Sequence, residues 1–93
     1  MAKQAVGPGR PFALHWGSGH IAEEATWQGE HHRPAIQLLQ FDDGHHEIRF
    51  CHFDEMGRFQ RSPLIVGNAE LQGLRDALKE TPRLRQALQQ MVG

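Results

Sequence analysis

Three arginines and three phenylalanines lie within residues 49–61 and have the chemistry to hold unstacked nucleobases. An aromatic ring stacks on a base, which contributes about 1–3 kcal/mol per base, and a guanidinium binds phosphate. The candidate nucleic-acid-binding residues are therefore Arg49, Phe50, Phe53, Arg58, Phe59 and Arg61. The alternative is an ordinary solvated face of a sheet, in which arginines and rings are scattered among ion pairs.

Seven histidines are the unusual feature of the composition, and the pairs His31–His32 and His45–His46 invite a metal site. Neither pair has a recognised ligand spacing such as His-Glu-x-x-His. His46 and His52 are six positions apart, which is about 20 Å along a strand, so they cannot share an ion by themselves. We expect solvated turn histidines and no metal or other cofactor. Their charge responds to mild acid, so a metal-dependent or pH-responsive protein is the third and weakest hypothesis.

The single cysteine, Cys51, excludes a disulfide within the chain and a four-thiolate metal site. His52 follows it directly, but adjacent strand residues point to opposite faces, so His52 cannot activate the thiol. We expect a buried structural thiol. Asp42 and Asp43 precede Gly44 in a pattern typical of a hairpin turn, not of paired catalytic carboxylates. No catalytic residue is identified, and we expect a protein that is not an enzyme.

The chain has 93 residues, which corresponds to one small domain, and its net charge is −1. This charge argues against general, charge-driven binding to nucleic acid at neutral pH. The sequence contains no run of about 18 apolar residues, and its beginning lacks the apolar stretch of a secretory signal. Together with the lone cysteine, these features lead us to expect a cytoplasmic protein without a membrane partner.

Alternation of apolar and polar residues predicts strands, and a change to helical spacing predicts a helical C-terminus. Residues 1–10 are expected to form a flexible arm and residues 11–93 a single domain. We expect an optional hairpin at 12–16 and 21–28, broken at Gly17–Gly19, and then a strand meander over 35–66. Its strands are 35–41, 46–53 and 59–66, and the helical part is 68–91.

Several single residues add detail to the predicted helices and to the last predicted strand. Asn68 is a favourable N-cap, and Thr81 followed by Pro82 indicates the start of a second helix. Gly73 inside the first helix costs about 1 kcal/mol relative to alanine, which indicates a close neighbour. Pro63 cannot donate a hydrogen bond, so the strand 59–66 needs an edge or a bulge there.

Both faces of the predicted sheet carry large apolar groups. On the central strand, Arg49, Cys51 and Phe53 share one face with Glu47, whereas Phe50 shares the other with His46, Ile48 and His52. The helical segment covers only one face. The N-terminal hairpin, a second copy of the chain or a ligand must cover the other, and a homodimer is a reasonable solution for so short a chain.

The segment from Ile36 to Leu88 resembles the C-terminal single-stranded DNA-binding domain of the positive cofactor four family of transcriptional coactivators, and the related whirly-type domains. Ile48-Arg49-Phe50 stands at the Ile-Arg position of the family's strand, and residues 54–57 stand at its acidic, glycine-containing turn. Leu64 and Val66 fall at its Gly-Ile-x-Leu segment. Leu71 and Leu74 fall where the family has a helical Trp and Leu.

This resemblance implies a curved four-stranded sheet backed by a helix, a homodimer formed through helix and sheet, and binding of melted DNA or RNA. Ser62-Pro63 replaces the family's basic Lys-Gly pair, which leaves Arg49, Arg58 and Arg61 to compensate. We therefore expect an α+β fold in which a curved antiparallel sheet of four or five strands precedes one or two helices.

The leading hypothesis is a non-enzymatic, homodimeric module that binds single-stranded DNA or RNA and acts in transcription or its regulation. The second is a dimerisation or protein-interaction domain of the same fold without nucleic-acid binding.

Overall fold

The computed structural model describes residues 9–93, in which four strands precede two α-helices joined by a short 3-10 helix. The strands are β1 (Pro11–Leu14), β2 (Gly17–Thr26), β3 (Arg33–Phe41) and β4 (His46–Phe53). The helical elements are α1 (Asn68–Ala77), η2 (Leu78–Glu80) and α2 (Pro82–Val92). This order confirms the expected fold class, an antiparallel sheet followed by a helical C-terminus.

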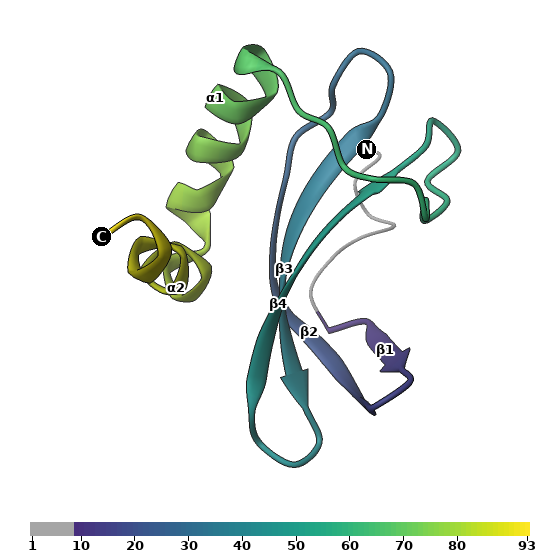
Figure 1. Cartoon of the computed structure of the whole chain (residues 1–93), viewed down its shortest axis with the longest axis vertical. Coiled ribbons are helices and arrows are strands. Elements are labelled where there is room, and N and C mark those ends of the chain that lie inside the picture. The colour runs from purple at the N-terminus through teal and green to yellow at the C-terminus, as the bar shows by residue number, and fades with distance from the viewer. Residues whose placement is uncertain (1–8) are drawn as a thin grey trace.

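The four strands form one antiparallel meander in the order β1-β2-β3-β4 (Figure 1). β2, β3 and β4 are 10, 9 and 8 residues long, whereas β1 has 4 residues. Figure 1 shows both α-helices on the same side of the curled sheet, whereas β1 extends the sheet at its lower end. The sheet therefore has one face that the helices cover and a second face, which we call the concave face.

Of the expected N-terminal arm, residues 1–8 lie outside the described residues. The last two residues of that arm already pair with β2. The Gly9 N–H donates to the Ile21 carbonyl at 2.7 Å, and the Ile21 N–H donates to the Arg10 carbonyl at 2.8 Å. Arg10 is therefore fixed beside the sheet before β1 begins.

The expected N-terminal hairpin is present, but its turn lies at His15 and Trp16, not at the glycines that follow. Leu14 pairs with Gly17, so β2 begins directly after the turn. The glycine at position 19 meets a packing demand, because a Cβ there would overlap the backbone carbonyl of Gln40 in β3. Gly19, which was expected to break the strand, instead allows two backbones to approach closely, and Gly17 leaves room for the Phe41 ring.

The strand expected over residues 59–66 is wrong. Only Phe59 pairs, in an isolated bridge to Phe53, and the Gln60 N–H donates to the His52 carbonyl at 3.0 Å. Beyond these contacts the chain leaves the sheet and crosses to the helical side. Pro63 has no N–H to donate, which is consistent with the end of pairing before it.

The helical side is closed by the second helix. Leu84 of α2 is completely buried against Ala25 of β2 and Ile36 and Leu38 of β3. Replacing a leucine in such a position by alanine costs about 2–5 kcal/mol. The backbone N–H of Leu84, one of the unpaired donors in the first turn of α2, donates to the Glu23 carboxylate at 2.9 Å. The sheet therefore both buries and caps this helix.

A second apolar cluster lies at the lower end of the concave face. Phe12 of β1 packs with Ile21 of β2 and with Leu39 and Phe41 of β3, and Leu14 lies against this group. The rings of Phe12 and Phe41 meet edge to face with centroids 4.9 Å apart. The N-terminal hairpin thus covers part of the second apolar face. This is one of the three covers that the sequence led us to expect.

A β-bulge interrupts β2 at Ala22. Ile21 pairs with Leu39 and Glu23 pairs with Leu38, so Ala22 is the additional residue. Because of this bulge, Ile21 and Glu24 face the same concave side although they are three positions apart. Glu23 turns to the helical side, where it caps α2.

The helix starts differ in one respect from expectation. The residue that caps α1 is Gly67, and Asn68 is already the first helical residue. The Glu70 carboxylate accepts a hydrogen bond from the Gly67 N–H at 2.9 Å, which ties down the helix start. Thr81 precedes Pro82 at the start of α2, as predicted. Within residues 9–93, no helix is long and apolar enough to cross a membrane.

Candidate functional site

A groove of about 500 Å³ opens on the concave face between the N-terminal hairpin and β4. Its apolar part comes from the first hairpin and includes Phe12, Leu14 and Ile21. Its polar and aromatic part comes from the residue before β1, from β4 and from the segment after β4. It consists of Arg10, Arg49, Phe53, Phe59 and Arg61. Four of the six sequence-predicted site residues therefore line one groove.

Arg49 is held in this groove by two contacts. Its Nε donates to the Oε1 of Gln37 on the neighbouring strand at 2.8 Å. Its guanidinium carbon lies 5.1 Å from the centroid of the Phe59 ring, within the range of a cation–π interaction. The amide of Gln37 is completely buried, so it fixes the direction of the Arg49 side chain. The result is a pre-oriented cation beside an aromatic ring.

The two phenylalanines of the groove differ in exposure. Phe53 is 4% exposed and Phe59 is 47% exposed. Their rings meet edge to face at 5.9 Å, and the guanidinium carbon of Arg33 lies 4.8 Å from the Phe53 centroid on β4. Phe53 is therefore a supporting ring, whereas Phe59 offers an accessible face for stacking.

The structure does not bring Arg58 or Phe50 into the groove. The Arg58 Nε donates to the Asp54 carboxylate at 2.9 Å within the turn after β4, and its side chain is 73% exposed. The hydrogen bonds from the Arg58 backbone and side chain, together with that from the Met56 N–H, lower the pKa of Asp54. Phe50 alternates with Arg49 and points to the helical side of β4.

A carboxylate that the sequence reasoning did not select lies beneath the groove. The side chain of Glu24 is 2% exposed. It accepts hydrogen bonds from Arg10 at 3.3 Å and from the Nε2 of Gln37 at 2.7 Å. Burial raises the pKa of Glu24, and the Gln37 hydrogen bond and the charges of Arg10, Arg33 and Arg49 oppose that rise. A polar chain thus runs from Arg10 through Glu24 and Gln37 to Arg49.

The sequence alone does not predict the whole of this row of polar contacts from Arg10 to Arg49. Alternation identified the face of Arg49, but the face of Glu24 depends on the bulge at Ala22. Arg10 was assigned to the arm because the residues before it show no apolar periodicity. The one available clue was Glu24 itself, an acidic residue within a predicted strand, where carboxylates are seldom found.

Cys51 also lies on the concave face and is 4% exposed, which confirms the expected buried thiol. Burial raises its pKa to about 11, so the thiol stays protonated at neutral pH. A protonated, buried thiol is neither a nucleophile nor a metal ligand. Cys51 therefore contributes to packing, together with Ala35 and Phe53.

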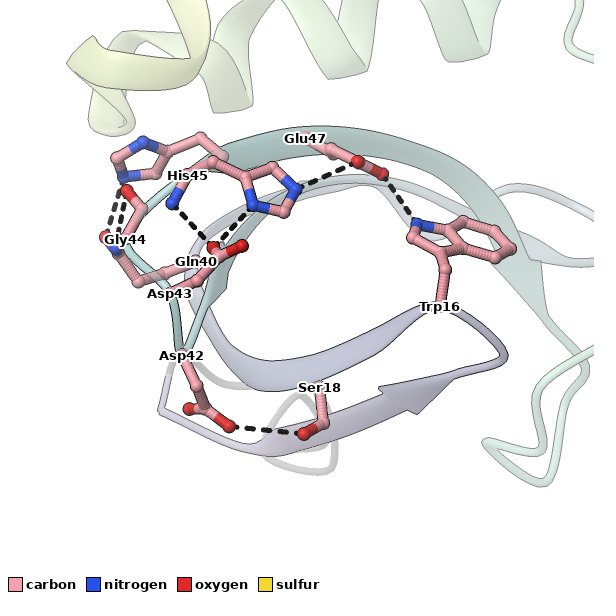
Figure 2. A network of polar contacts seen from close by, with 9 residues as sticks. Trp16, Ser18, Gln40, Asp42, Asp43, Gly44, His45 and Glu47 are labelled. Atoms are coloured by element: carbon pink, nitrogen blue, oxygen red, sulfur yellow. Dashed lines mark hydrogen bonds and ion pairs between the residues drawn. The ribbon is translucent and has the colours of Figure 1, made fainter.

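The histidines lie in separate environments. His45 in the β3–β4 turn approaches the Asp43 carboxylate at 2.5 Å and the Glu47 carboxylate at 3.0 Å, as Figure 2 shows. The rings of His32 and His52 meet edge to face with centroids 5.0 Å apart. Among residues 9–93, no group of three or more His, Cys, Asp or Glu side chains is arranged to hold a metal ion.

Comparisons with known protein families, with curated proteins and with solved structures find no match to this chain.

Proposed function

We propose that this chain is a small, non-enzymatic module that binds single-stranded DNA or RNA in the groove of its concave face. Phe59 stacks on an unpaired base, and Arg49 and Arg61 contact the flanking phosphates. A role in transcription or its regulation, and a cytoplasmic location, remain expectations from the resemblance and the composition.

The single observation that supports this proposal most strongly is the pairing of Arg49 with Phe59. A half-exposed ring and a fixed guanidinium at 5.1 Å offer a stacking surface and a phosphate contact side by side. Bases in a duplex are stacked on each other and their faces are unavailable, so this arrangement favours a single strand. A groove of about 500 Å³ has room for an unstacked base.

The near-zero net charge limits how strong this binding is. If Arg49 and Arg61 each neutralise one phosphate, the logarithm of the binding constant falls with the logarithm of salt concentration with a slope of about −1.4. The proposal is therefore one of weak, stacking-dependent binding, with little contribution from a general basic surface.

Fluorescence anisotropy with labelled oligo-dT and with a duplex of equal length tests the proposal. We expect preferential binding of the single strand, which weakens as salt is raised. Absence of single-strand binding at neutral pH and about 50 mM salt, where phosphate contacts are strong, contradicts it.

Two matched pairs of variants locate the site. Phe59 and Phe50 are 47% and 48% exposed on opposite sides of the sheet. Phe59→Ala removes the stacking contact and weakens binding by about 1–3 kcal/mol, whereas Phe50→Ala leaves it unchanged. Arg49→Ala likewise weakens binding, with Arg58→Ala as its control. Equal losses in both members of either pair would place the site elsewhere.

The second candidate function is a dimerisation or protein-interaction domain without nucleic-acid binding. It is favoured by several large apolar residues that are about half exposed or more, namely Trp16, Phe50, Met56, Ile65, Leu71, Met91 and Val92. We propose a homodimer in both cases. Light scattering after size exclusion tests it, and a monomer at all accessible concentrations excludes it.

A further inference from the structure

We propose that Glu24 competes with bound phosphate for the cations of the groove, so that binding of a single strand is coupled to uptake of one proton by this carboxylate. This inference rests on the proposed function of the groove and concerns its regulation.

The geometry places Glu24 between the two sides of the groove. Arg10, before β1, donates to its carboxylate at 3.3 Å, and Gln37 of β3 donates to it at 2.7 Å. The other amide atom of Gln37, Oε1, accepts from Arg49 of β4 at 2.8 Å. One buried amide therefore connects the carboxylate to the arginine that the proposed function assigns to phosphate.

Within residues 9–93, the charges that act on Glu24 are those of arginines. Arg33 of β3 and Arg49 of β4 act on it through their charges, as does Arg10. Cys51 of β4 also faces it, but this thiol remains uncharged at neutral pH. The negative charge of Glu24 is therefore balanced mainly by arginines, two of which line the groove.

A bound phosphate shares these arginines with Glu24. Its negative charge lies on the open side of Arg49 and offsets part of the positive potential that favours the ionised carboxylate. The carboxylate is buried, so water cannot stabilise its charge when the positive potential of the arginines is offset. Protonation of a Glu24 oxygen by a proton from solvent then removes the repulsion between the two anions.

The direction of the pH effect follows from linkage. Burial already raises the pKa of free Glu24, and bound phosphate raises it further. Affinity for a single strand therefore increases as the pH falls through the pKa of the bound form, and it levels off below the pKa of the free form. Other ionisable groups also change charge with pH, so the test must isolate Glu24.

Glu24→Gln isolates it because the amide keeps an oxygen acceptor for Arg10 and removes the charge. We expect Glu24→Gln to bind labelled oligo-dT about tenfold more tightly at pH 7, the order of one partly screened repulsion between unit charges. Glu23→Gln is the matched control, since it changes the same net charge on the same strand but faces α2. It should change affinity by less than about twofold.

A second measurement uses the unmodified protein and does not depend on the folding of a variant. The carboxyl carbon resonance of Glu24, followed by NMR, should titrate at higher pH with saturating oligo-dT than without it. An unchanged titration midpoint, or equal affinities of the wild type and Glu24→Gln, overturns the inference while leaving the proposed function intact.

The remaining outcomes are also decisive. If the wild type binds oligo-dT more weakly than Glu24→Gln at pH 7 and the difference disappears as the pH falls, Glu24 is confirmed as the competing anion. If neither protein binds between pH 5 and pH 7, the proposed function fails, and this inference fails with it.

Discussion

The indole of Trp27, just beyond β2, lies directly against the backbone of Gly73 in α1. A Cβ at position 73 would overlap the ring atoms Cγ, Cδ2 and Cε2 of this tryptophan. The glycine that the sequence marked as needing space is therefore the point where α1 approaches the sheet. Leu74, the next residue of α1, is 5% exposed, whereas Leu71 is 51% exposed, so the helix meets the sheet through Gly73 and Leu74.

Gly73→Ala is expected to destabilise the protein although alanine favours helices. Overlap with the indole costs about 1–3 kcal/mol, which exceeds the gain of about 1 kcal/mol from helix propensity. Denaturant unfolding monitored by tryptophan fluorescence measures the change. Gln72→Ala, at an exposed position one residue earlier, should be neutral or slightly stabilising. A stabilised Gly73→Ala protein would show that the indole moves aside without cost.

Cys51 should resist modification in the folded protein. The residue is 4% exposed and burial raises the pKa of its thiol to about 11, so the reactive thiolate is scarce at pH 8. We expect reaction with a disulfide reagent such as Ellman's reagent only after unfolding in denaturant. Rapid stoichiometric labelling of the native protein would mean that β4 opens readily or that the thiol is not buried.

His45 is expected to titrate above the usual value for a histidine. Two side-chain hydrogen bonds raise the pKa of His45, the larger contribution from Asp43 and the smaller from Glu47 (Figure 2). The raised pKa stabilises the folded state below the pKa of the unfolded chain, about 6.5, and this contribution is lost as the pH rises through the folded pKa. NMR titration of the ring measures the midpoint directly.

Asp43→Asn should lower the titration midpoint of His45, because Asp43 makes the larger contribution. Asp42→Asn is the matched control, since Asp42 bonds to Ser18 at 3.2 Å and not to His45. A midpoint that falls equally in both variants would indicate a general charge effect without the specific hydrogen bond.

Much of the fold was predictable because alternation and turn chemistry are local. The predicted strand 35–41 lies within β3, and the predicted strand 46–53 has the same bounds as β4. The Asp42–Gly44 turn joins them as expected. The strand over 59–66 failed because its apolar residues fit a strand pattern, whereas the chain after Phe59 is held by contacts distant in sequence. One of these is the hydrogen bond between the His52 ring and the Ser62 carbonyl at 3.1 Å.

The candidate site was predictable to a lesser degree. Arg49 and Phe53 share a face because strand residues alternate, and the turn at residues 54–57 returns Phe59 to them. Alternation alone already placed Phe50 on the opposite face. Arg58 could not be assigned from the sequence, because its position depends on a local bond to Asp54 within the turn.

The bulge at Ala22 decides which face of the sheet each later residue of β2 occupies. If β2 paired regularly through Ala22 without the bulge, the residues after Ala22 would exchange their faces of the sheet relative to the residues before it. Either Ile21 would leave the apolar cluster, or Glu23 and Glu24 would exchange their roles as helix cap and buried anion. When this chain is aligned with a candidate relative, a gap at Ala22 therefore keeps Ile21, Glu23 and Glu24 on their present faces and is compatible with a shared groove, whereas a gap between Glu23 and Ala25 is not.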